Sequence, residues 1–281
     1  QWESKMAGKQ APSVFSLRTF CLLTGASKGL GKCMAKTFAD KFPKGSVLLL
    51  IARSKDLLEK LQSEISSTQS KNGKSVVIKI AAMDLSKQSE NDFTACIENT
   101  LRDVGQRASD FEQAVVVHNA ASLGDVSKKF TEFDSCYDVQ QYFSLNVASV
   151  VGLNSRFLKA FPKESVRQRL VLNISSICAL QPFKTWSLYC AGKAARDMLF
   201  RTMALEDPDI RVLNYAPGPL DTEMQVAART ETGDKELRML FEGMHSDEKL
   251  LSCDDTMVKV VKLLHENTFA SGAHIDYYDL P

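Results

Sequence analysis

The sequence predicts an α/β fold, with one doubly wound domain whose parallel sheet of about seven strands carries helices on both faces. Short β-branched runs alternate with longer amphipathic stretches along the 281 residues. The short runs are apolar without strict alternation, which is typical of parallel strands covered on both faces. No linker rich in Pro, Gly or Ser divides the chain. We therefore expect a single domain over residues 19–281, after an extension at 1–18 in which Met6 is a candidate natural start and residues 1–5 an added remnant.

Seven apolar runs give the expected strands. In order they are Phe20–Leu23, Val47–Ile51, Val76–Ala81, Ala114–Val117, Leu170–Ile174, Ile210–Tyr215 and His274–Tyr277. Between the strands, apolar residues recur at helical spacing. The longest of the expected helices are Asp134–Phe161 and Ser187–Glu206. Strands that alternate with helices imply right-handed crossovers and hence a parallel sheet.

The segment of residues 220–248 differs from the rest of the chain. It is polar, follows Pro217-Gly218-Pro219 and has weak periodicity. A long segment after the end of a strand is a candidate substrate loop or lid. The alternative is a surface excursion without a role in binding.

The composition excludes several classes of protein. The 35 basic residues balance 34 acidic ones, so neither nucleic acid nor an anionic membrane is expected as the main partner. The longest strongly apolar run, Val47–Ala52, is far shorter than the roughly 20 residues that cross a bilayer. The seven cysteines are scattered, with no C-x-x-C pair and no Cys/His cluster at metal-ligand spacing. Reduced thiols in a cytoplasmic protein without a metal fit this pattern.

A glycine-rich loop follows the first expected strand and opens a helix. Its glycines permit positive φ, and the helix N-terminus offers free amides to a pyrophosphate. The alternative is a glycine turn without a ligand, but its position between a strand and a helix favours a Rossmann-type dinucleotide site. The expected cofactor-binding residues of the loop are Gly25, Ser27, Lys28, Gly29, Leu30 and Gly31.

The end of the second strand favours NADP(H) over NAD. An NAD site usually places a carboxylate there, whereas this strand is followed by Arg53 and Ser54. Arg53, helped by Lys28, is expected to contact the 2′-phosphate; the alternative is two solvated cations. Asp84 and Leu85 end the third strand, where a carboxylate can bond the adenine amino group. Asn119 ends the fourth strand and is expected to pack on the adenosine ribose, although both sites could be ordinary turns.

Four residues form a candidate catalytic set. Tyr189 is the one tyrosine with a lysine four residues on, Lys193, so both share a helix face. A neighbouring ammonium is expected to lower the pKa of the phenol. Ser176 follows an expected strand and can orient a substrate carbonyl. Asn146, within the long helix at 134–161, is expected to kink it and to carry a water relay to Lys193.

These residues resemble the pattern of the short-chain dehydrogenase/reductase family from Phe20 to the C-terminus. The resemblance implies hydride transfer between a nicotinamide and a carbonyl, with Tyr189 protonating the oxygen. The matching positions are Gly25, Gly29, Gly31, Asn119, Asn146, Ser176, Tyr189 and Lys193.

Longer strings are similar to a member of that family that reduces side-chain carbonyls of a pterin in tetrahydrobiopterin synthesis. They include residues 122–128, 178–184, 188–200 and 212–222. The resemblance implies NADPH as cofactor, a cytoplasmic homodimer, and a pterin whose adjacent N–H donors bind the carboxylate of Asp276, with Gly218 leaving room beside the ring. Asp279 is a rival anchor. A broader carbonyl or diketone reductase and an NADP-binding sensor without chemistry are the alternative functions.

Overall fold

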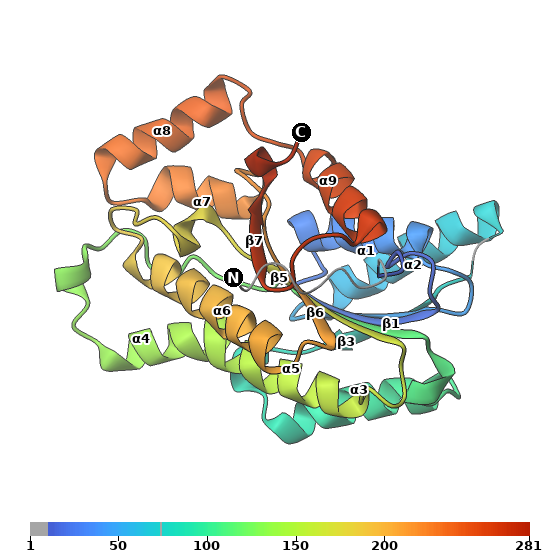
Figure 1. The fold of residues 1–281 in the computed structure, drawn as a ribbon. Coiled ribbons are helices and arrows are strands. Elements are labelled where there is room, and N and C mark those ends of the chain that lie inside the picture. Colours follow the sequence, from blue (N-terminus) through green and yellow to red (C-terminus); the bar gives the residue numbers. More distant parts are fainter. Residues whose placement is uncertain (1–10, 74) are drawn as a thin grey trace, which may run out of the picture.

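The computed structural model describes residues 11–73 and 75–281, and these form an α/β sandwich around one sheet (Figure 1). The sheet has seven parallel strands in the order β3-β2-β1-β4-β5-β6-β7. The strands are β1 (Thr19–Thr24), β2 (Val47–Ala52), β3 (Val77–Ala82), β4 (Gln113–His118), β5 (Gln168–Ile174), β6 (Ile210–Ala216) and β7 (Ala273–Asp276). The predicted doubly wound fold is therefore confirmed, and each strand lies within two residues of its predicted bounds.

Helices cover both faces of the sheet. One face packs against α1 (Gly29–Lys41), α2 (Lys55–Asn72) and α9 (Cys253–Glu266). The other packs against α3 (Glu90–Asp103), α5 (Ser149–Ala160) and α6 (Ser187–Glu206), and α4 (Cys136–Phe143) leads into α5. Because both faces are covered, the central strands are wholly buried, as their apolar runs predict.

Local sequence signals set several helix ends. Capping boxes begin α3 and α9, where the hydroxyls of Ser89 and Ser252 accept from the backbone N–H of Asp92 and Asp255 at 3.3 and 3.1 Å. Gly73 ends α2 in the left-handed conformation, with φ of 65°. These caps satisfy backbone groups that the helix itself leaves unpaired.

The predicted long helix at 134–161 is interrupted where Asn146 lies. A π-helical turn, Ser144–Ala148, joins α4 to α5. Such single turns inside helices often occur at functional sites. The kink expected at Asn146 thus takes the form of a π turn.

The prediction that residues 220–248 form an irregular loop is wrong. This segment forms two helices, α7 (Glu223–Glu231) and α8 (Lys235–Ser246), which stand as a separate pair outside the two helical layers (Figure 1). Each has only about two or three turns at 3.6 residues a turn, so its apolar periodicity is short and weak. α8 has no fully buried residue, which explains its polar sequence.

Part of the predicted extension belongs to the domain. Val14 is fully buried, and its N–H donates to the carbonyl of Leu264 in α9 at 3.0 Å. Residues 1–10, which include Met6, lie outside the described residues. All seven cysteines are free thiols. Among the described helices, none has the length and apolar character needed to cross a membrane.

Candidate active site

The carboxyl ends of the strands meet at one edge of the sheet, and most of the predicted site residues lie there. The strand order reverses between β1 and β4. From β1 the chain adds β2 and β3 on one side, and it then returns to add β4 on the other side of β1. Ligands of doubly wound folds bind in the crevice at such a reversal. The glycine loop follows β1 and Asn119 follows β4, so the two segments flank this crevice.

The glycine loop, residues 24–31, turns sharply from β1 into α1. Gly25 and Gly29 have positive φ values of 68° and 49°, a region that favours glycine. A Cβ atom on Gly31 would lie 2.1 Å from the carbonyl oxygen of Gly25, so only glycine fits there. The loop therefore leaves its backbone bare, and a pyrophosphate can approach the amides closely.

Asn119 holds the glycine loop against the end of β4. Its Nδ2 atom donates to the carbonyls of Thr24 and Gly25 at 3.0 and 3.2 Å. Its backbone N–H donates to Oγ1 of Thr24 at 3.0 Å. The side-chain amide is thus engaged in fixing the loop, and its packing on an adenosine ribose stays a prediction.

The N-terminus of α1 is open to an anion. Lys28, at the N-cap, makes no side-chain capping bond. Instead its Nζ atom lies 2.8 Å from Oε1 of Glu223 at the start of α7, and both side chains are more than half exposed. An exposed pair of this kind contributes only about 0–1 kcal/mol, so a phosphate could displace Glu223. Leu30 is buried below the loop, and Ser27 is half-buried.

Arg53 and Ser54 directly follow β2, and Arg53 is exposed. A hydrogen bond from Ser86, whose Oγ lies 2.7 Å from Oδ1 of Asp84, lowers the pKa of Asp84, and the charge of Arg53 adds to this effect. The predicted phosphate cation and the predicted adenine-binding carboxylate are therefore neighbours. Leu85 is buried beside them.

Ser176, Tyr189 and Lys193 are brought together at the end of β5 and the first turns of α6. Burial raises the pKa of the Tyr189 phenol, and the hydroxyl of Ser176 acts to lower it, as a neighbouring hydrogen-bond donor does. The Nζ atom of Lys193 lies 5.5 Å from the centre of the Tyr189 ring. It donates a 2.7 Å hydrogen bond to the carbonyl of Ile174. The arrangement can present a hydroxyl and a phenol to one carbonyl oxygen, which is the chemistry predicted for these side chains.

Burial dominates the electrostatics of this group. It raises the pKa of Tyr189, and the hydrogen bond from Ser176 opposes this only in part. The lowering of this pKa that we expected from Lys193 is therefore wrong for this structure. Burial, followed by the charge of Arg196, also lowers the pKa of Lys193 to about 7. A phenol that stays protonated at neutral pH is in the form that can donate a proton to a carbonyl oxygen.

Asn146 links the π turn to the segment after β4. Its Oδ1 atom accepts from the backbone N–H of Ser122 at 2.9 Å, and its Nδ2 atom donates to the carbonyl of Tyr142 at 3.0 Å. The residue is buried. These two bonds fix the amide, whereas the water relay to Lys193 stays a prediction.

Asp276 ends β7 and lies beside Ala216 in the sheet register, at the same edge as the other residues. It is half-buried, and its Oδ1 atom accepts from the N–H of Tyr278 at 3.0 Å. The rival Asp279 is engaged with the backbone N–H of Asp276 at 2.8 Å. The Asp276 carboxylate thus caps the last turn of the chain, and its binding of a pterin stays a prediction.

Gly218 turns the chain after β6 with φ of 76°. A Cβ atom there would lie 2.8 Å from Cδ1 of Leu251 and 3.5 Å from Cβ of Tyr277. The space next to this glycine is thus taken up by neighbouring side chains. Among the described contacts this glycine provides a turn and a close approach, and the room that it leaves beside a bound ring stays a prediction.

Trp186, which the sequence reasoning missed, forms a wall of the site with α7 and α8. Its ring packs edge to face on Tyr189 and stacks on Phe241 of α8, with centroids 5.3 and 5.2 Å apart. Its Nε1 atom donates to Thr232 at 3.0 Å. The two helices at 220–248 therefore rest on Trp186, the neighbour of the candidate catalytic residue Tyr189, a position that suits a substrate wall.

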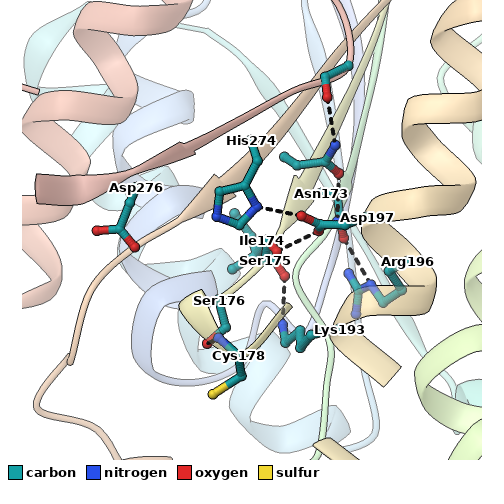
Figure 2. Close-up of polar contacts among 12 residues, drawn as sticks. Asn173, Ile174, Ser175, Ser176, Cys178, Lys193, Arg196, Asp197, His274 and Asp276 are labelled. Carbon is teal, nitrogen blue, oxygen red and sulfur yellow. Dashed lines mark hydrogen bonds and ion pairs between the residues drawn. The ribbon is translucent and has the colours of Figure 1, made fainter. Parts of the chain in front are cut away.

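A buried polar network behind the catalytic residues was also missed as part of the site (Figure 2). Its members are Asn173, Ser175, Arg196, Asp197 and His274. Arg196 and Asp197 follow Lys193 by three and four residues and so share its helix face, which is the one sequence signal for them. Within the described residues, no group of His, Cys, Asp and Glu side chains could hold a metal ion.

Known proteins match both the sequence and the fold. The family model "short chain dehydrogenase" matches residues 19–233. Sepiapterin reductase of Rattus norvegicus is 44% identical over 262 residues, covering 92% of this chain and 96% of the relative. Sepiapterin reductase of Xenopus tropicalis is 41% identical over 260 residues, with the same coverage of 92% and 96%. The crystal structure of the KRED1-Pglu enzyme, 24% identical, has a TM-score of 0.76 and covers 92% of this chain and 100% of that chain.

The solved structure supports the fold, whereas the sequence matches define the family. The family match spans most of the chain and includes the glycine loop, Ser176, Tyr189 and Lys193. The two relatives extend the similarity over nearly the whole chain. The chain therefore belongs to the short-chain dehydrogenase family.

Proposed function

We propose that this protein reduces side-chain carbonyls of a pterin, such as sepiapterin or 6-pyruvoyl-tetrahydropterin, with NADPH, as in tetrahydrobiopterin synthesis. The observation that carries the proposal is the grouping of Ser176 and Tyr189 beside the buried Lys193, whose Nζ atom lies 5.5 Å from the centre of the Tyr189 ring. The two relatives named sepiapterin reductase support the substrate class, because their similarity extends over more than 90% of this chain. This function places the chain among the NADP-dependent oxidoreductases.

The residues fit a dinucleotide. The bare backbone at Gly25 and Gly31 forms a cradle that a Cβ atom would fill. The amides of α1 face that cradle, and Arg53 supplies a cation at the end of β2, where no carboxylate stands. We assign the pyrophosphate to the glycine loop and the 2′-phosphate to Arg53 and Lys28. When bound, NADPH supplies the hydride for the carbonyl carbon.

The protein's side chains then perform the polar part of the reaction. Ser176 donates a hydrogen bond to the carbonyl oxygen and orients it toward Tyr189. Tyr189 gives its hydroxyl proton to that oxygen, so the carbonyl becomes an alcohol. The Lys193 side chain, fixed by Ile174, would hold the nicotinamide ribose of a bound cofactor and would stabilise the resulting tyrosinate. Asp276 accepts adjacent N–H donors of the pterin, which sets the ring in one orientation.

We further propose a cytoplasmic homodimer. Large apolar side chains are exposed on α5 and α6, the neighbouring helices of one sheet face; they are Val151, Met198, Leu199 and Leu205. A second copy packed on this face would cover them. Leu205→Glu should then shift the sedimentation of the protein from dimer to monomer. The seven free thiols fit a reducing compartment.

The proposed function is tested by following NADPH oxidation with sepiapterin as substrate, with a small 1,2-diketone in parallel. A kcat/KM for sepiapterin well above that for the diketone supports the pterin reductase. Reduction of the diketone alone would support the broader carbonyl reductase instead. A protein that binds NADPH but turns over neither substrate would be the silent sensor.

A further inference from the structure

Asp197 is a buried carboxylate that hydrogen-bonds two separate segments of the chain, the end of β5 and β7. It lies on α6, and its side chain is only 5% exposed. Its Oδ1 atom accepts from Oγ of Ser175 at 2.5 Å and from Nδ2 of Asn173 at 3.2 Å. Its Oδ2 atom accepts from Nδ1 of His274 on β7. Because an ionised carboxylate only accepts, Nδ1 of His274 carries the hydrogen.

These contacts join the two ends of the proposed substrate site. Ser175 is the neighbour of Ser176, and Asp197 lies one helical turn after Lys193. His274 precedes Asp276 by two residues, so both side chains lie on the same face of β7, as Figure 2 shows. One carboxylate thus connects the strand that carries the pterin anchor to the elements that carry the catalytic groups.

The side chain of His274 is the polar link that leaves β7 itself toward the catalytic elements, whereas the other side-chain hydrogen bonds hold the residues before and after the strand. The strand has four residues, all partly exposed, and pairs with β6 on one side. Two other side-chain links flank the strand: Asn214 donates a 3.3 Å bond to the carbonyl of Gly272 just before it, and Nζ of Lys259 donates to the carbonyl of Tyr277 at 3.0 Å just after it. The His274 ring is 90% buried, and its Nε2 atom has no hydrogen-bond partner among the described atoms. Its Nδ1 bond to Asp197 is therefore the polar contact that orients this ring.

We propose that Asp197 and His274 are positioning residues, which set the distance between the pterin anchor Asp276 and the catalytic group of Ser176, Tyr189 and Lys193. Neither touches the substrate; they act through β7 and β5. This inference rests on the proposed function. A pterin is held at both ends of the site, whereas a small diketone needs only the catalytic end. The pair therefore controls specificity for the larger substrate.

Two substitutions of His274 test the proposal, because asparagine and glutamine carry the same amide group on side chains that differ by one methylene. In His274→Asn the amide nitrogen lies near the position of Nδ1, so the bond to Asp197 is kept. In His274→Gln it lies near the position of Nε2, so that bond is lost. We expect His274→Gln to raise the KM for sepiapterin about tenfold or more, the usual effect of losing one charged hydrogen bond, while kcat/KM for a 1,2-diketone changes little. His274→Asn should stay near wild type for both substrates.

The double variant His274→Gln/Asp276→Ala shows whether His274 acts through Asp276. If it does, the double variant binds sepiapterin no more weakly than Asp276→Ala alone, because the anchor is already gone. Additive losses, or equal losses for sepiapterin and diketone in His274→Gln, would overturn the positioning role and leave the proposed function intact. Wild-type protein that does not reduce sepiapterin would instead remove the proposed function, and this inference with it. Thermal melting of each variant identifies any general loss of folding, which would lower both activities together and also count against the proposal.

Discussion

The ammonium group of Lys193 donates a 2.7 Å hydrogen bond to the backbone carbonyl of Ile174, the last residue of β5. This bond anchors a lysine that is almost fully buried, beside Tyr189 and behind Ser176. Burial lowers the pKa of Lys193 to about 7, against about 10.4 in an unfolded chain. Lys193, to which we assign a catalytic role, is therefore also a source of pH-dependent stability.

The first prediction concerns this pH dependence. Between pH 7 and about 10, the unfolded chain binds one more proton at Lys193 than the folded chain does, so the contribution of this residue to the free energy of unfolding rises with pH. We compare wild type with Lys193→Met by urea unfolding at pH 6.5 and pH 9.5. The stability of wild type relative to the variant should increase at the higher pH. A difference that is the same at both values would contradict the lowered pKa.

The second prediction concerns the proton donor. Tyr189→Phe removes the phenolic hydroxyl with almost no change in volume. Loss of a general acid costs about 100- to 10,000-fold in rate, so kcat with sepiapterin should fall by that amount. NADPH binding, measured by fluorescence titration, should survive. Near-normal turnover by this variant would rule out the role of Tyr189.

The third prediction concerns cofactor choice. Arg53→Gln removes the charge at the end of β2, and Arg53→Asp reverses it. Loss of one charge-assisted phosphate contact should weaken NADPH binding about 10- to 100-fold, whereas NADH, which has no 2′-phosphate, should be much less affected. Lys28→Gln is the matched control, with a smaller effect because Lys28 is already paired with Glu223. Equal losses for both cofactors would disprove the assignment of Arg53.

The fourth prediction concerns the pterin anchor. Asp276 also caps the turn after β7 by accepting from the N–H of Tyr278, and Asp276→Asn keeps an oxygen for this bond. The asparagine has one acceptor oxygen in place of the two carboxylate oxygens, so it cannot accept from two adjacent N–H donors of a pterin. Both Asp276→Asn and Asp276→Ala should therefore raise the KM for sepiapterin strongly, with a smaller change for a 1,2-diketone. If Asp276→Asn behaves like wild type while Asp276→Ala does not, the residue serves the turn and the anchor lies elsewhere.

The fifth prediction concerns strain next to the catalytic helix. Thr185 has φ of 64°, which is unfavourable for a β-branched residue, and its buried hydroxyl has no hydrogen-bond partner among the described atoms. Thr185→Gly relieves this strain, and glycine loses more backbone entropy on folding than threonine. The net effect should be a free energy of unfolding higher by about 1 kcal/mol and a melting temperature higher by about 2 °C. Thr185→Ala keeps the Cβ atom and should gain less. A lower melting temperature for the glycine variant would show that the backbone is not strained.

The sequence predicts those parts of this fold and site that depend on local pattern. Short apolar runs identify the strands, most clearly the five central ones that are buried on both faces, because parallel strands need no polar face. The glycines of the loop are recognisable because their positions exclude a Cβ atom. The spacing of Tyr189 and Lys193 reflects one helical turn. Each of these signals lies within a few residues of chain.

The remaining features depend on contacts between distant segments. Asp197 and His274 are 77 residues apart and carry no motif, so their contact arises only when β7 pairs with β6. The pKa of Tyr189 is set by burial, which a local motif does not reveal. α7 and α8 are short helices whose apolar residues find partners such as Trp186 only in the folded protein.

The start of α7 touches the cofactor loop, because a Cβ atom on Gly29 would lie 3.2 Å from the methyl group of Thr222. The same helical pair rests through Phe241 on Trp186, the neighbour of Tyr189. A nucleotide on the loop and a pterin in the crevice would therefore both contact the pair α7 and α8. Binding of either ligand would order these helices and so favour binding of the other. Thermodynamic reciprocity then requires that the factor by which the nucleotide tightens pterin binding equals the factor by which the pterin tightens nucleotide binding. The enzyme would fill as a cooperative pair of sites, in which the empty protein binds either ligand weakly and the singly occupied protein binds the second ligand tightly.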